Sequence, residues 1–146
     1  MKLSQTVAYA VHAVLRVADN ASGSPVSCNK LAEQSKMPER YLLQILRDLG
    51  KYGILQSTRG GSGGFMLVRP LDEISLLDVI EAVEGPMAAA LPLKDDLPKQ
   101  AGGRLLDVLR GVTEEVRRQL EAVKLSDLAK ADSAGESTPK RKGKGR

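Results

Sequence analysis

Apolar residues recur every three or four positions in several stretches of the chain, a spacing typical of one face of an α-helix. In the first stretch these residues are Val7, Ala10, Val11, Val14, Leu15 and Ala18. Ser4 stands where an N-cap would begin the helix, and turn-forming residues from Asn20 to Pro25 would end it. Because His12 and Arg16 interrupt the apolar run, the pattern predicts an amphipathic helix and not a secretory signal.

A short and a longer helical segment follow. Ser27 is placed to cap a helix that runs to about Gln34, and Pro38 suits the first turn of the next helix. That helix would end near Tyr52. Its inward-facing residues would be Leu42, Ile45, Leu46 and Leu49. The order of short helix, tight turn and longer helix predicts a helix-turn-helix over about residues 27–52, although small helical bundles contain similar pairs.

Two strand-like runs, Ile54 to Thr58 and Phe65 to Val68, flank a glycine-rich segment. The sequence between them is Arg-Gly-Gly-Ser-Gly-Gly, from Arg59 to Gly64. Glycine permits close backbone approaches, so we expect a β-hairpin with a slim tip over residues 54–69. A phosphate-binding P-loop is excluded, because no Gly-Lys-Ser/Thr follows and the next predicted element is a strand.

Arg59 and Gly60 begin this glycine-rich tip. In a two-stranded wing beside a helix-turn-helix, an arginine at this place could enter the narrow, electronegative minor groove of DNA. A flexible surface turn with an incidental arginine explains the same residues equally well.

The third predicted helix carries the candidate DNA-reading side chains outside its apolar stripe. They are Arg40, Tyr41, Leu43, Gln44, Arg47 and Lys51. Arginine and glutamine can each make two hydrogen bonds to a base edge. Arg47 and Lys51 could equally bind phosphate, which positions a protein without reading sequence. Tyr41 would as readily pack between helices as touch DNA.

Charge divides the chain into three parts. Residues 1–70 hold nine Lys/Arg and four Asp/Glu, residues 71–132 hold eight and thirteen, and residues 133–146 hold five and one. The basic first half favours a surface for a polyanion, although ordinary surface charge would give a similar count. With three Tyr, one Phe and no Trp, stacking of several bases on aromatic platforms is not expected.

These features resemble the Rrf2 family of bacterial winged-helix transcription regulators. The matching stretches are Met1-Lys2-Leu3-Ser4, Tyr9-Ala10-Val11, Pro25-Val26-Ser27, Leu31-Ala32-Glu33, Tyr41-Leu42, the wing from Arg59 to Gly64, Arg69-Pro70, residues 74–80 and residues 82–86. The resemblance is close over residues 1–86 and loose as far as Leu128. It implies a mainly α-helical fold with a small β-hairpin wing, and a homodimer that binds an imperfect palindrome in double-stranded DNA and usually represses transcription.

In the family, a long helix after the winged domain crosses its partner to form the dimer. We expect this dimerisation helix over residues 104–130, after a connector at residues 87–103. Its seam would consist of Leu105, Leu109, Val112, Val116, Leu120 and Val123. The alternative is a helix packed on its own domain. Residues 131–146 are expected to be a disordered basic tail, which would either add non-specific DNA affinity or only solubilise the chain.

The chain departs from the family at its cysteines. Iron–sulfur members carry three cysteines in the connector, whereas residues 87–103 contain none here, so no cofactor or metal is expected. The only cysteine, Cys28, lies on the second predicted helix, where a packing role is favoured over a redox switch. Leu43 stands where relatives often have an acidic reader of cytosine, and Thr6-Val7-Ala8 replaces a frequent Lys-Gly-Arg. The operator is therefore expected to differ from those of well-known relatives.

Two functions follow from this pattern. The first is a dimeric, cluster-free repressor in the bacterial cytoplasm, with the third helix in the major groove and Arg59 in the minor groove. The second is an interaction module that kept the fold but regulates a protein partner, with DNA binding weakened or dependent on an unknown effector. An enzyme is rejected because no nucleophile with its base, paired acid and base, or cofactor motif is present. No apolar run is long enough for a membrane span.

Overall fold

The computed structural model describes residues 1–20, 22–60 and 63–135, with side chains up to Lys130. Within these residues the helices are α1 (Gln5–Ala18), α2 (Cys28–Ser35), α3 (Glu39–Lys51), α4 (Leu76–Glu84), α5 (Lys99–Ala122) and α6 (Leu125–Gly135). The strands are β1 (Leu55–Thr58) and β2 (Gly64–Leu67), and short 3-10 turns lie at η1 (Leu71–Glu73) and η2 (Lys94–Asp96). This order confirms the expected mainly helical fold with one hairpin.

Serine caps begin the first two helices, as the sequence predicts. The Ser4 hydroxyl accepts the backbone N–H of Val7 at 3.2 Å, and the Ser27 hydroxyl accepts that of Lys30 at 3.2 Å. Each bond satisfies an N–H group that has no partner within its own helix. Lys36 ends α2 in the left-handed conformation, with φ of 54°, and so makes the tight turn toward α3.

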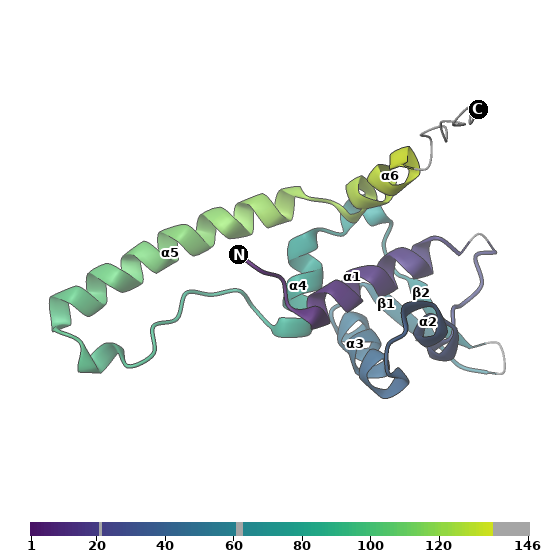
Figure 1. Ribbon diagram of the computed structural model, residues 1–146, viewed down its shortest axis with the longest axis horizontal. Coiled ribbons are helices and arrows are strands. Elements are labelled where there is room, and N and C mark those ends of the chain that lie inside the picture. Colours follow the sequence, from purple (N-terminus) through teal and green to yellow (C-terminus); the bar gives the residue numbers. More distant parts are fainter. Residues whose placement is uncertain (21, 61–62, 136–146) are drawn as a thin grey trace, which may run out of the picture.

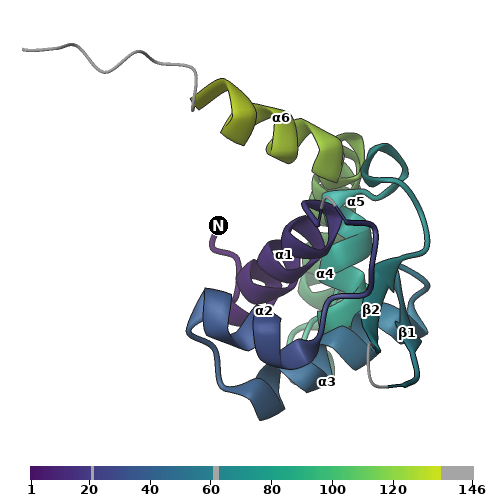
Figure 2. The same ribbon diagram turned by 90° about the vertical axis from the view of Figure 1, so that its right-hand side faces the viewer.

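The core lies where α1, α3 and α4 pack against one another (Figures 1 and 2). The predicted inward face of α3 is buried there. Of the predicted face of α1, Val7, Ala10 and Val14 are buried, whereas Val11, Leu15 and Ala18 are half-buried. Fully buried side chains include Val7, Val14, Leu42, Leu46, Leu49, Ile54 and Val79. This packing fixes the opposite face of α3 toward solvent, which is the face that carries the candidate DNA-reading residues.

The wing is an antiparallel hairpin whose register pairs Leu55 with Leu67 and Thr58 with Gly64. Val26, just before α2, adds a further bridge, because its N–H and C=O both bond to the backbone of Phe65 at 3.0 and 2.9 Å. A Cβ at Gly64 would lie 2.5 Å from the Val26 carbonyl, so only glycine permits this close approach. The wing is thereby attached directly to the start of the helix-turn-helix.

The expected single helix over residues 104–130 is wrong, because the chain forms α5 and α6 with a break at Val123. At the break the Val123 carbonyl accepts the N–H of Leu76 at 2.8 Å, and the Leu125 N–H donates to the Ile74 carbonyl at 2.9 Å. Leu125 is fully buried in the core of the winged domain. The helix therefore breaks because these tertiary contacts draw Leu125 inward.

Two boundaries in this part of the chain differ from those expected. The connector expected at residues 87–103 ends earlier, because α5 begins at Lys99 directly after Pro98, whose fixed φ suits a helix start. Residues 131–135, which were expected to belong to the tail, are part of α6. The rest of that basic segment, residues 136–146, lies outside the described residues. Figure 1 shows α5 extending away from the winged domain and the connector running beside it to its far end.

Candidate nucleic-acid interface

The solvent face of α3 carries the predicted polar set. Arg40, Tyr41, Gln44, Arg47 and Lys51 are exposed, and Leu43 is half-buried. Glu39 lies in the first turn of α3 and Lys51 lies in its last turn, an arrangement that suits the helix dipole. This face offers three cations, Arg40, Arg47 and Lys51, to a polyanion.

Sequence reasoning missed Asp48 on this helix. The Gln44 Nε2 donates a hydrogen bond to the Asp48 carboxylate at 3.0 Å, one helical turn away. The spacing of four residues is the signal that could have revealed this pair. This bond occupies one of the two N–H groups of the Gln44 amide, which leaves the other N–H and the carbonyl oxygen available.

Tyr41 is engaged with α1. Its ring meets the ring of Tyr9 edge to face, with centroids 5.9 Å apart, and its hydroxyl pairs with the Thr6 hydroxyl. The Tyr9 hydroxyl in turn accepts a hydrogen bond from Gln5 at 2.7 Å. These contacts favour the interpretation in which Tyr41 fixes α3 against the start of α1.

At the wing, Arg59 and Gly60 are exposed directly after β1. Gly60 has φ of 118°, a conformation that other residues rarely adopt, and its carbonyl accepts the Gly63 N–H at 2.9 Å. The Thr58 hydroxyl accepts the Gly64 N–H at 3.2 Å and closes the base of the tip. Arg59 thus begins the turn between the strands, and residues 61–62 lie outside the described residues.

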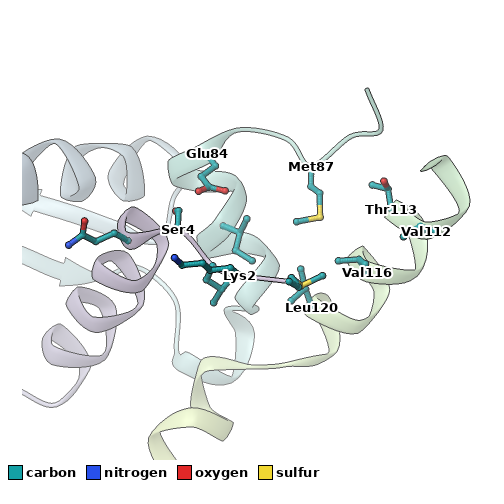
Figure 3. Close-up of a pocket in the computed structure, with 12 residues that line it drawn as sticks. Lys2, Ser4, Glu84, Met87, Val112, Thr113, Val116 and Leu120 are labelled. Carbon is teal, nitrogen blue, oxygen red and sulfur yellow. The ribbon is translucent and has the colours of Figure 1, made fainter. Parts of the chain in front are cut away.

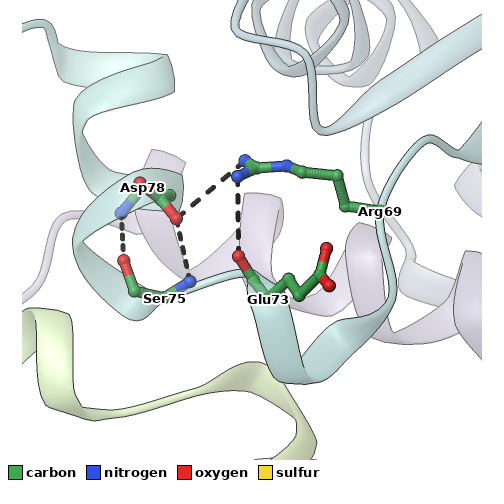
Figure 4. Close-up of polar contacts among 4 residues, drawn as sticks. All are labelled: Arg69, Glu73, Ser75 and Asp78. Carbon is green, nitrogen blue, oxygen red and sulfur yellow. Dashed lines mark hydrogen bonds and ion pairs between the residues drawn. The ribbon is translucent and has the colours of Figure 1, made fainter.

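A polar cluster that the sequence analysis missed joins the wing to α4 (Figure 4). Ser75 and Asp78 form a capping box, in which the Ser75 hydroxyl accepts the Asp78 N–H and the Asp78 carboxylate accepts the Ser75 N–H, both at 3.0 Å. Arg69, just after β2, lies 3.9 Å from the same carboxylate and donates to the Glu73 carbonyl at 3.5 Å. The signal for this cluster was the Ser-x-x-Asp spacing.

A second surface lies on α5, where only Gly102 is buried. Leu105 is 42% exposed, Val108 61% and Val112 57%, all along one face of the helix. An open cavity of about 560 Å³ lies between α5, α4 and the N-terminal residues (Figure 3). Its lining includes Lys2, Ile80, Glu84, Met87, Val112, Val116 and Leu120. Part of the predicted seam therefore remains uncovered within one chain.

Residues 3–131 match the Rrf2 family, described as "Iron-dependent Transcriptional regulator". The chain belongs to the Rrf2 family. It is a DNA-binding transcriptional regulator with a winged-helix fold, and not an enzyme.

Curated relatives and solved structures agree with this assignment. An HTH-type transcriptional regulator of Mycobacterium tuberculosis is 36% identical over 131 residues, which cover 88% of this chain and 81% of the relative. The CymR regulator of Bacillus subtilis is 28% identical over 129 residues, covering 88% and 90%. The structure of B. subtilis CymR, the global cysteine regulator, superposes with a TM-score of 0.70 at 27% identity and covers 90% of this chain and 98% of its own. The IscR structure from T. potens gives a TM-score of 0.71 at 26% identity, covering 95% and 93%.

Iron is named in the family's description, but the donor atoms of this Rrf2 protein do not fit an iron–sulfur cluster. Such a cluster needs about four ligands, mostly thiolates. The segment from Met87 to Gly103 has no cysteine, and the whole sequence has one Cys and one His. In the part of the chain that the structure describes, no three His, Cys, Asp or Glu side chains gather where they could hold a metal ion.

Cys28, the remaining redox candidate, is half-buried on α2 with its Sγ 3.7 Å from the Glu39 carbonyl oxygen. Burial, and to a lesser extent the negative charge of Glu39, raise the pKa of its thiol. A raised pKa keeps the thiol protonated and disfavours the reactive thiolate. These surroundings favour a packing role.

None of the described helices is long and apolar enough to cross a membrane.

Proposed function

We propose that the chain is an iron-independent, dimeric repressor that reads a palindromic operator with α3 and the wing. The observation that carries the proposal is the placement of exposed Arg40, Arg47 and Lys51 on one helix, whose apolar face is buried, next to a wing that begins its turn with Arg59. A protein of this kind would act in the cytoplasm, on chromosomal DNA.

On this proposal α3 lies in the major groove, and its side chains make two kinds of contact, with base edges and with phosphate. Arg40 and Gln44 are suited to base edges, because arginine matches guanine and glutamine matches adenine through paired hydrogen bonds. Arg47 and Lys51 lie about one and two helical turns beyond Gln44 and are suited to phosphate or to a further base. Leu43, which has no polar group, could contact only a thymine methyl group.

The wing supplies a second contact at the minor groove. Arg59 begins the glycine-rich tip, and the adjacent Gly60 carries no side chain that would keep the backbone away from DNA. Arginine is attracted to the enhanced negative potential of a narrow minor groove, so this contact would favour A·T-rich flanks.

The dimer is supported by the apolar face of α5. A helix of 24 residues is about 36 Å long, and its stripe of Leu105, Val108 and Val112 is exposed in a single chain. Covering this stripe with α5 of a second copy would remove apolar surface from water and place two recognition helices on one duplex. Part of the stripe continues into the open cavity through Val112, Val116 and Leu120.

Selection of bound sequences from random double-stranded DNA tests the proposal, followed by affinity measurements with single variants. We expect an enriched palindrome, and we expect Arg47→Ala and Arg59→Ala each to weaken its binding by about 1–3 kcal/mol. Arg118→Ala is the matched control, because Arg118 lies on α5 and pairs with Glu115 of the same helix at an exposed position.

Two results would contradict the proposal. One is binding that depends on salt but not on sequence. The other is an Arg118→Ala defect as large as those of the α3 and wing variants. Sequence-indifferent binding would favour the alternative in which this fold regulates a protein partner.

A further inference from the structure

The Glu81 carboxylate on α4 joins three segments of the chain. One oxygen, Oε1, lies 3.1 Å from Nη1 of Arg117 on α5, and the other, Oε2, accepts the Met87 N–H at 2.9 Å. Arg117 Nη1 also donates to the Met87 carbonyl at 2.9 Å. The Glu81 side chain is only 10% exposed. We call these three residues the α4–α5 clamp.

The clamp differs from the other ion pairs of α5. Arg110 pairs with Asp107, and Arg118 pairs with Glu115, each within the same helix and near its exposed surface. Such pairs contribute little to stability. The clamp instead connects α5 to a different element and has further hydrogen bonds to backbone groups, so it constrains how the two helices lie relative to each other.

A second attachment holds the end of the same helix. The backbone bonds between residues 74–76 and 123–125, together with buried Leu125, fix the chain directly after α5. Arg117 and Val123 are six residues apart, about 9 Å along a helix. One attachment point would leave α5 free to swing, whereas two points fix its direction.

The N-terminal part of α5 extends beyond the clamp beside its own connector (Figure 1). There Gly102 packs against Lys94 and Leu97 of that connector. From Arg117 back to Lys99 the helix extends about 27 Å, so a tilt of about 10° at the clamp would move the far end by about 5 Å. Neighbouring base pairs are separated by about 3.4 Å along the DNA axis. A small change in this angle therefore moves the far end of α5 by more than the separation of neighbouring base pairs.

The clamp is also connected to the wing. Asp78 lies on α4 one turn before Glu81, and its carboxylate holds Arg69 at the end of the wing (Figure 4). The wing, the capping box and α5 are therefore all attached to α4. Any force that tilts α5 acts on the element that positions the DNA-binding wing.

We propose that Glu81 and Arg117 are positioning residues that set the angle between the winged domain and α5, and thereby the half-site spacing that the dimer accepts. The inference rests on the proposed dimeric repressor. Neither residue lies on α3 or the wing. Their effect is on the separation of the two recognition helices, which bind half-sites at a distance fixed by the geometry of the dimer.

The test uses the full chain and the palindrome selected by the wild-type protein, with base pairs added or removed between the half-sites. For the wild type we expect a preference of about tenfold or more for one spacing over the spacing one base pair longer. For Arg117→Met and for Glu81→Gln we expect this preference to fall below about threefold. Dimerisation and affinity for a single half-site should remain within about twofold of wild type, since α3 and the wing are unchanged. Arg118→Met is the matched control and should retain the wild-type preference.

A third variant separates geometry from simple stability. Arg117→Lys keeps one positive charge near Glu81 but can donate fewer, less directed hydrogen bonds, so it should restore part of the spacing preference. If Arg117→Met fails to fold, the nearly isosteric Glu81→Gln provides the same measurement. A wild-type spacing preference in both variants would overturn the inference, as would loss of the dimer in the folded variants. A wild-type protein that binds no palindrome would instead overturn the proposed function.

Discussion

Cys28 illustrates how surroundings decide the role of a single residue. Its thiol lies against the Glu39 carbonyl between α2 and α3, and burial and Glu39 raise its pKa. A thiol with a raised pKa holds its proton at neutral pH, so the reactive thiolate is scarce. These surroundings favour a role as a small apolar group that packs α2 against α3.

We therefore predict slow alkylation of Cys28. At pH 7.5 the native protein should react with iodoacetamide several-fold more slowly than glutathione does, because the thiolate fraction falls as the pKa rises above the pH. The rate should reach that of glutathione in denaturant, which is the internal control. Equal rates in the native state would contradict the account, as would loss of DNA binding on mild oxidation.

At the scale of elements, local sequence signals predicted the winged domain well. Ser4 and Ser27 cap their helices because a cap depends only on the next few residues, and the glycines mark the hairpin by the same local logic. The break after α5 was not predicted, because it depends on the Leu125 side chain reaching a core formed by distant segments. A local signal was present in Asp127, whose carboxylate accepts the Lys124 N–H at 3.1 Å and so caps α6.

In the candidate site, too, local features could be predicted from the sequence and contacts between distant residues could not. The exposed face of α3 follows from its apolar period, so its polar residues could be named from the sequence. The contacts of Tyr41 with Tyr9 and Thr6 could not be predicted, because they join residues more than thirty positions apart. The Glu81–Arg117 ion pair could not be predicted from the sequence for the same reason.

The attachment of the wing to the start of α2 can be tested by a substitution at Gly64. In Gly64→Ala the new methyl group would lie 2.5 Å from the Val26 carbonyl, so the wing must shift away from the start of α2. We expect a loss of about 1–3 kcal/mol in the free energy of unfolding, measured with urea, and weaker DNA binding.

Gly103→Ala is the control for this prediction. Gly103 lies within α5 with nothing within 4 Å of the added Cβ, so the substitution should be neutral or stabilise the helix by up to about 1 kcal/mol. Unchanged stability in Gly64→Ala would contradict the close approach of the wing to Val26.

At the scale of the whole molecule, α5 is a long helix with an apolar stripe that its own chain leaves exposed. A second copy of α5 is the cover that the proposed function requires. Val108 lies in this stripe and is 61% exposed. We predict that Val108→Glu converts the protein to a monomer in analytical ultracentrifugation, because a carboxylate buried in an apolar seam costs several kcal/mol.

The same substitution should abolish the preference for a palindrome over a single half-site while leaving the winged domain folded. Arg118→Ala changes the net charge by the same single unit on the same helix and should remain dimeric. If Val108→Glu sediments as the wild type does, α5 is not the dimer contact.

Recognition of DNA by an iron-free dimer can be measured by native mass spectrometry of the chelator-treated protein. The protein would be mixed with its selected palindrome and, separately, with a duplex that carries one half-site. We predict two chains on the palindromic duplex, a mass that contains no iron, and an affinity that iron and sulfide added under anaerobic conditions do not change. A complex that forms only after iron loading, or a single chain on the palindrome, would contradict the account.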